Sequence, residues 1–169
     1  MDRWRGRRLA GLAVTALLAS TMAGAVAMAR DDGAHWVVVR DRAGVELVRA
    51  AISPSDGFAL RYRNSVYGSL AEEHFEVDGE ELRVVELRAD ELAVLEEYYT
   101  AVGATRSGPS SDRTWAIEVE RPPIALPLRV QATALGERTL LAAEQAISLW
   151  RLVAERDDTL VILTIEETE

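Results

Sequence analysis

Asn64, Glu73 and Glu86 are the residues of this chain whose types and predicted positions could do chemistry. Two predicted β-hairpins place their side chains in one row across three neighbouring strands. Directly opposed residues in a sheet have Cβ atoms about 4.5–5.5 Å apart, so two carboxylates there must share a proton, bind a cation or be solvated by water. The row could therefore act in acid–base chemistry, hold a cation or contact a ligand; the plain alternative is a solvated strand end.

The strands that position this row follow from the period-2 alternation of apolar and polar residues. The alternation predicts strands over residues 58–66 and 71–77, and the loop between them places Asn64 opposite Glu73. A second turn then begins a third strand, which places Glu86 opposite Glu73. This register gathers apolar side chains on one face and complementary charges on the other, and a slip of one residue would destroy both patterns.

The N-terminal segment has the layout of a secretory signal peptide. Four arginines precede an uncharged run over residues 9–29, and Ala27-Met28-Ala29 offers a cleavage site of small residues. A run of this length could also remain as a membrane anchor. Because the arginines come before the run, the domain after it is expected to face outward. We therefore expect an exported protein, periplasmic or extracellular, that is either released by cleavage or anchored by residues 9–29.

The composition limits the chemistry and the partners. The leader, residues 1–29, contains four of the 19 basic residues and one of the 28 acidic residues, so the exported part carries a formal charge of −12. Such a domain is repelled by nucleic acid and by anionic membrane surfaces. The chain has no cysteine, which excludes disulfides, thiol chemistry and a lipoprotein attachment. Residues 30–169 are enough for one domain with one core.

Short apolar segments separated by turn residues run through the rest of the chain. They predict further strands at residues 36–39, 45–48, 115–119, 126–132 and 160–165. The last of these is apolar on both faces, as in a central strand. Two segments, residues 90–102 and 141–152, fit either a helix or a strand. The sequence therefore predicts an all-β fold, an antiparallel β-sandwich or barrel-like domain that could include one short helix.

Three other features have plain structural interpretations. His35 follows the leader and is expected to be a surface residue rather than a metal ligand. Tyr98 and Tyr99 could form a sugar-stacking platform, but half-buried core aromatics explain them more simply. The polar loop over residues 106–113 could carry a binding function or none.

The segment around the polar row also carries the residues of a known motif: Tyr62, Ser65, Val66 and Glu73. In these positions it resembles the small exported domain-of-unknown-function family 1850, whose signature is tyrosine, any residue, histidine, serine and valine, with a downstream glutamate. Asn64 stands where the family usually has histidine. A glycine-rich segment later in the family pattern is reduced here to residues 102–104. The resemblance covers residues 58–104 best.

Members of this family are often encoded beside TAXI-type TRAP transporters for organic solutes. The resemblance therefore implies an envelope protein of all-β character that is accessory to solute uptake. Its partners would be a membrane transporter, the solute-binding protein of that transporter or a small organic solute, with no cofactor. Asparagine does not titrate, so Asn64 in place of histidine favours binding or structure over acid–base catalysis.

We therefore predict a non-enzymatic extracytoplasmic accessory or binding domain of the cell envelope. Its expected ligand-binding residues are Tyr62, Asn64, Ser65, Glu73 and Glu86. One alternative is a purely structural envelope domain. Another is a small enzyme or metal-binding protein that uses Glu73 and Glu86 as paired carboxylates about 5 Å apart, although nothing else in the sequence supports that chemistry.

Overall fold

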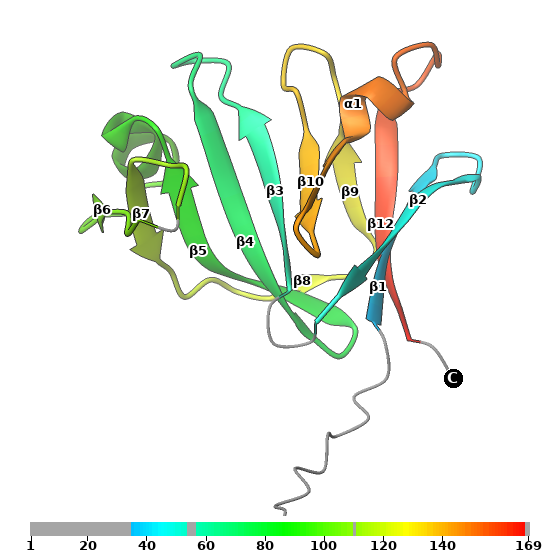
Figure 1. The fold of residues 1–169 in the computed structure, drawn as a ribbon, viewed down its shortest axis with the longest axis horizontal. Coiled ribbons are helices and arrows are strands. Elements are labelled where there is room, and N and C mark those ends of the chain that lie inside the picture. The colour runs from blue at the N-terminus through cyan, green and yellow to red at the C-terminus, as the bar shows by residue number, and fades with distance from the viewer. Residues whose placement is uncertain (1–34, 54–56, 110, 168–169) are drawn as a thin grey trace, which may run out of the picture. The chain divides into compact units, whose positions relative to one another are not determined.

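The computed structural model describes residues 35–53, 57–109 and 111–167. They form two antiparallel β-sheets and a short α-helix, which confirms the predicted all-β, sandwich-like class (Figure 1). The predicted leader, residues 1–29, lies outside the described residues, as does the predicted start of the exported domain at residue 30. Within the described ranges, no helix has the length and apolar character needed to cross a membrane.

One sheet contains four strands: β1 (His35–Asp41), β2 (Glu46–Ile52), β9 (Leu128–Gln131) and β12 (Leu160–Glu167). Their order is β2-β1-β12-β9. β12 therefore lies between β1 and β9, which confirms that the C-terminal apolar segment is a central strand. The predicted first hairpin is also present as the pair of β1 and β2.

The other sheet contains eight strands: β3 (Phe58–Arg63), β4 (Leu70–Asp78), β5 (Glu81–Ala89), β6 (Thr105–Arg106), β7 (Trp115–Glu118), β8 (Ile124–Ala125), β10 (Thr139–Ala142) and β11 (Gln145–Ser148). Their order is β11-β10-β3-β4-β5-β7-β6, and β8 pairs with the beginning of β5. The strands that were predicted to hold the polar row, β3, β4 and β5, thus form the middle of this sheet.

The core lies between the inner faces of the two sheets, because both contribute to one cluster of buried apolar side chains. The cluster includes Val37, Val39, Val161 and Leu163 from the four-stranded sheet and Leu60, Phe75, Leu82, Leu87 and Leu140 from the eight-stranded sheet. Burying one such side chain stabilises a protein by about 1.5–3 kcal/mol, whereas an exposed ion pair contributes about 0–1 kcal/mol. The core therefore determines which face of each strand points inward.

Both segments that fitted either a helix or a strand contain a short helix. Residues 90–102 hold η1 (Val94–Tyr98), one π-helical turn whose Val94 and Leu95 are fully buried. Residues 141–152 begin in the β10–β11 hairpin and end in α1 (Leu149–Leu152), whose Leu149 is fully buried. A helix this short is not stable alone, so these buried side chains anchor each turn to the core.

The predicted pairing of Asn64 with Glu73 is wrong. β3 ends at Arg63, and Glu73 lies opposite Leu60. The cause is that the turn begins earlier than expected, at Asn64: its backbone N–H donates to the Ser69 carbonyl at 2.8 Å, and its side chain accepts hydrogen bonds from the next backbone N–H groups of the loop. Asparagine favours such turns over strand pairing. Because the register moves by four residues, an even number, Glu73 keeps its predicted inward face.

The predicted pairing of Glu86 with Glu73 is also wrong. The β4–β5 hairpin starts as expected, with Phe75 opposite Val84. Beyond this pair a β-bulge shifts the register, so that Glu86 lies opposite His74. One extra residue in a strand turns every following side chain to the other face. Glu86 therefore points away from the core, while Glu73 points toward it.

Candidate functional site

Three of the five predicted binding residues, Tyr62, Asn64 and Ser65, line one cavity of about 240 Å³. Its other walls come from η1 and from the β9–β10 loop. In Figure 1 the β3–β4 loop and the β9–β10 loop both project from the upper ends of their strands. Glu73 lies behind Tyr62 and is connected to it through Tyr99. The structure thus brings four of the five residues together.

Asn64 shapes the wall of this cavity. It is 2% exposed, and its Oδ1 accepts hydrogen bonds from the backbone N–H groups of Val66 at 2.9 Å and Tyr67 at 3.2 Å. Its carbonyl accepts the N–H of Gly68 at 2.8 Å. Asn64 therefore holds the loop in place, and the neighbouring Ser65 is exposed on that loop, where its hydroxyl can reach a ligand.

Tyr62, Tyr99 and Glu73 form a hydrogen-bond chain behind the cavity wall. The Tyr99 hydroxyl donates to Glu73 Oε1 at 2.7 Å, and the Tyr62 Oη lies 2.5 Å from the Tyr99 Oη. A phenol has one proton to donate, so Tyr62 must donate to Tyr99. The chain therefore runs from the cavity to the carboxylate, and its last bond is of the charge-assisted kind, which is about twice as strong as a neutral hydrogen bond.

Both phenols remain neutral near neutral pH. Burial raises the pKa of Tyr62 to about 12; the hydrogen bond with Tyr99 opposes this effect, and the negative charge of Glu73 adds to it. Burial, and then the charge of Glu73, raise the pKa of Tyr99 far above its ordinary value. Because neither hydroxyl ionises near neutral pH, the direction of the hydrogen-bond chain is constant, and Glu73 accepts the hydrogen bond from Tyr99.

Two arginines hold the tyrosine rings. The Arg138 guanidinium lies 4.1 Å from the centroid of the Tyr62 ring, and its Nη1 is 3.5 Å from Glu73 Oε2. Arg121 lies 5.2 Å from the centroid of the Tyr99 ring and donates to the Tyr99 carbonyl at 2.9 Å. Cation–π contacts of this kind contribute about 0.5–2 kcal/mol each. They position both rings, and Arg138 at the same time lines the cavity.

The cavity combines a cation with apolar walls. Arg138 provides the charge, while Tyr98 and Leu135 provide apolar surface that is 57% and 72% exposed. Nη1 of Arg138 is buried and makes no hydrogen bond to any described residue. Arg63 also lines the cavity, but its guanidinium is occupied by Glu137 at 2.8 Å. These features suit a small organic molecule with an anionic group and an apolar body.

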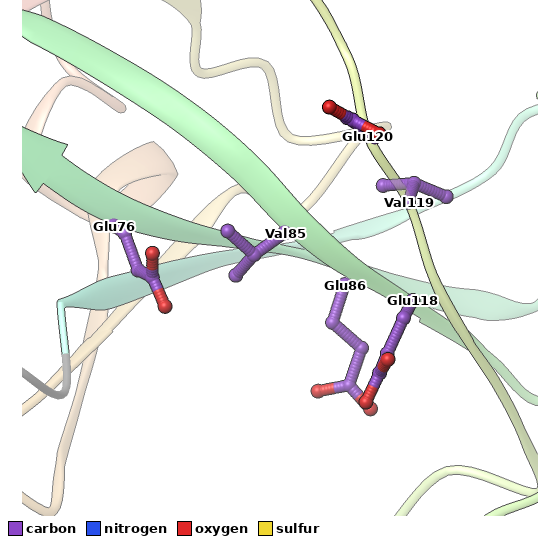
Figure 2. Close-up of a pocket in the computed structure, with 6 residues that line it drawn as sticks. All are labelled: Glu76, Val85, Glu86, Glu118, Val119 and Glu120. Carbon is purple, nitrogen blue, oxygen red and sulfur yellow. The ribbon is translucent and has the colours of Figure 1, made fainter.

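Glu86 belongs to a separate acidic hollow of about 540 Å³ on the outer face of the eight-stranded sheet. Figure 2 shows its carboxylate beside that of Glu118, which lies directly opposite on β7. Glu76 and Glu120 also line this hollow. Arg88 Nη2 donates to Glu86 at 2.7 Å. No group of three or more His, Asp or Glu side chains among the described residues is arranged to hold a metal ion.

The interpretation of Glu73 and Glu86 as paired carboxylates is therefore wrong. The two side chains lie on opposite faces of the eight-stranded sheet and cannot act on the same atom of a substrate. Glu73 instead interacts with Tyr99 and Arg138. A retaining glycosidase would need two carboxyl groups about 5 Å apart on either side of the scissile bond, and these two residues do not meet that requirement.

Tyr99 and Arg138 belong to the site but were not predicted to do so. Tyr99 was expected to be a core aromatic, and its ring does pack against the core, but its hydroxyl joins Tyr62 to Glu73. A polar tip on an apolar ring was the available signal. Arg138 had no signal in the sequence, because it reaches Tyr62 only through the pairing of β10 with β3.

The fold and the cavity define an all-β, sandwich-like domain with a small site made of tyrosines and Arg138, whose guanidinium is also paired with Glu73. No family model, curated protein or solved structure matches this chain. Its function is therefore inferred from the site and from the motif that lines it.

Proposed function

We propose that this protein is a non-enzymatic binding domain of the cell envelope, exported through residues 1–29, that binds a small organic acid and assists TRAP-type uptake of organic solutes. The anionic group of the ligand contacts Arg138. Its apolar part packs against Tyr98 and Leu135. The proposed partner is a membrane transporter of that type or its solute-binding protein.

The observation that carries this proposal is that two motif residues, Tyr62 and Ser65, line one cavity, with a third, Glu73, behind it. Tyr62, Asn64 and Ser65 line it together with Arg138, and Glu73 is bonded behind it. Ligand sites usually combine apolar walls with a few well-placed polar groups. The resemblance of this segment to an exported family encoded beside TAXI-type TRAP transporters supports the uptake role.

The chemistry of the site favours binding over catalysis. A general acid or base works best when its pKa lies near the operating pH. Asn64 does not titrate, and the pKa of Tyr62 is raised to about 12. Glu73 Oε1 already accepts the Tyr99 hydroxyl. The residues are thus arranged to hold a fixed surface rather than to move a proton.

The first experiment is a thermal-shift scan of the full chain with succinate and other small organic acids, and with calcium. A ligand at ten times its Kd stabilises a protein by about 1.4 kcal/mol, which raises Tm by roughly 5 °C for a domain of this size. Arg138→Ala is expected to abolish this increase. Arg83→Ala is the matched control, because Arg83 is an exposed arginine that pairs with Asp78 at 2.6 Å, away from the cavity.

The second experiment measures solute uptake in producing cells with Glu73→Ala. Uptake is expected to fall while the purified variant remains folded. The proposal is overturned if no organic acid raises Tm, which favours a purely structural domain. Stabilisation by calcium alone also contradicts the proposal. So does a Glu73→Ala variant that fails to fold, if the variants that do fold show no change in ligand binding.

A further inference from the structure

A second groove, of about 400 Å³, lies on the outer face of the eight-stranded sheet. Its floor is formed by side chains of β3, β4 and β5, and its rim by the polar loop after β6 and by the β10–β11 turn. The charged residues that line it are Arg61, Glu72, His74, Arg88, Asp112 and Glu144. None of these belongs to the cavity beside Tyr62.

The floor of the groove contains two cations on either side of a buried carboxylate. Arg61, Glu72 and Arg88 lie directly opposite one another on the three strands. Glu72 is 5% exposed and is already shared between His74 Nε2, at 3.1 Å, and Arg113 Nε, at 3.4 Å. Because Glu72 pairs with His74 and Arg113, it does not pair with Arg61 or Arg88, and these two guanidinium groups keep unused hydrogen-bond donors.

Those donors are available to an anion. Among the described residues Arg61 makes no hydrogen bond and no close ion pair, although it is half-buried. Arg88 uses Nη2 for Glu86, and its Nε is buried without a hydrogen-bond partner. Two guanidinium groups with free donors match the planar, two-oxygen geometry of a carboxylate.

The rim of the groove has the opposite charge. Asp112 and Glu144 are exposed and have no hydrogen-bond or ion-pair partner in the described part of the chain. Arg113 ties the Asp112 loop to the sheet, because its Nη1 lies 2.8 Å from both carboxylate oxygens of Asp90. A ligand in the groove therefore meets cations at the floor and carboxylates at the rim.

The turn that carries Glu144 is strained. Ala143 and Glu144 both have positive φ angles, 45° and 62°. A two-residue hairpin turn of this type normally uses Asn-Gly or Gly-Gly, because other side chains cost about 1 kcal/mol or more there. Strain of this kind is concentrated at ligand sites. Glu144 thus lies at the rim of the groove although its backbone conformation is unfavourable for a residue with a side chain.

From these observations we propose that the groove binds a small zwitterion of the α-amino-acid class. The carboxylate of the ligand contacts Arg61 and Arg88, and its ammonium group faces Asp112 and Glu144. A simple anion would be repelled by the rim, and a simple cation would leave the hydrogen-bond donors of Arg61 and Arg88 unused. This site is independent of the cavity beside Tyr62 and does not depend on the function proposed for it.

A matched set of three compounds tests the proposal. L-leucine has both charged groups, 4-methylpentanoate lacks the ammonium group, and 3-methylbutylamine lacks the carboxylate. Each is titrated into the ¹⁵N-labelled full chain, and amide NMR shifts are followed. L-leucine is expected to shift the amides of residues 59–61, 72–74 and 141–146, and each half-compound is expected to bind at least about 10-fold more weakly.

Two variants complete the test. Arg61→Ala is expected to weaken L-leucine binding by about 10-fold or more, and Glu144→Gln, at an exposed turn, by several-fold. Arg83→Ala is expected to leave binding unchanged. The proposal is overturned if about 10 mM L-leucine shifts none of these amides, if a half-compound binds as tightly as L-leucine, or if folded Arg61→Ala or Glu144→Gln binds L-leucine like the wild type.

Discussion

The hydrogen-bond chain behind the cavity can be broken by removing a single oxygen atom. Tyr99→Phe removes the hydroxyl that donates to Glu73 Oε1 at 2.7 Å and accepts from Tyr62 at 2.5 Å, and it leaves the ring in place. Among the described residues Glu73 then keeps Arg138 as its partner, whose Nη1 lies 3.5 Å from Oε2. The Tyr62 hydroxyl, on a residue that is 5% exposed, loses its acceptor.

The expected loss of stability follows from these two bonds. A hydrogen bond to a charged group contributes about 1.5–3 kcal/mol and a neutral one about 0.5–1.5 kcal/mol. The Glu73 side chain is 24% exposed, so water recovers part of the first contribution. We therefore expect Tyr99→Phe to lower the free energy of unfolding by about 2 kcal/mol, which lowers Tm by roughly 5–10 °C for a domain of this size.

Urea unfolding of the wild type, Tyr62→Phe, Tyr99→Phe and the double variant measures the effect and the coupling. The coupling energy between the two hydroxyls is expected to be about 1 kcal/mol. Tyr98→Phe is the control, because the Tyr98 hydroxyl has no hydrogen-bond partner among the described residues and its side chain is 57% exposed. A Tyr99→Phe variant as stable as Tyr98→Phe, or a coupling energy near zero, would refute the hydrogen-bond chain.

Three further predictions concern the elements around the sites. Asn64→Ala removes the acceptor for two loop amides and is expected to cost about 1–2 kcal/mol in urea unfolding, whereas Asn64→Asp, which keeps an acceptor, is expected to cost less. Burial raises the pKa of Glu72, but the hydrogen bond and charge of His74 and the charges of Arg113 and Arg61 outweigh it, so the folded pKa lies below 4.5. The stabilisation from ionised Glu72 is complete above pH 4.5 and is lost as the pH falls through the folded pKa. The stability difference between wild type and Glu72→Gln should therefore shrink on acidification. A difference that stays constant with pH would contradict this prediction. Gly57→Ala would place a Cβ 1.8 Å from the Phe75 carbonyl oxygen and is expected to cost more than about 3 kcal/mol, whereas Gly79→Ala, which has a similar φ but open space, should cost only about 1 kcal/mol; equal Tm values for the two variants would contradict this.

The fold could be predicted because its signals are local. Continuous apolar runs along β1 and β12 and the apolar–polar alternation along β3 predict which segments enter the core, and the turns between strands carry glycine or aspartate. The register of the strand pairs was harder to predict. Asn64 fits the end of a strand and the start of a turn equally well, and only the bonds that it makes in the folded loop decide between them. The shift between β3 and β4 follows from that one side chain.

The bulge in β5 did leave a trace in the sequence. The buried apolar residues Leu82 and Val84 alternate on even positions, while Leu87 and Ala89 alternate on odd positions. This change of phase marks the extra residue that turns Glu86 outward. The arginines of the site had no such signal. Arg138 lies just before β10, far along the chain from Tyr62, so its contribution depends on the pairing of β10 with β3.

The most direct test of the central claim is to locate the bound organic acid. Succinate is titrated into the ¹⁵N-labelled full chain, and the amide shifts are compared with those of Arg138→Ala. The proposed site predicts shifts in residues 62–65, 98–99 and 131–138 that disappear in Arg138→Ala. Shifts confined to other residues, or shifts that survive unchanged in Arg138→Ala, would contradict the assignment of the Tyr62 and Arg138 cavity as the binding site.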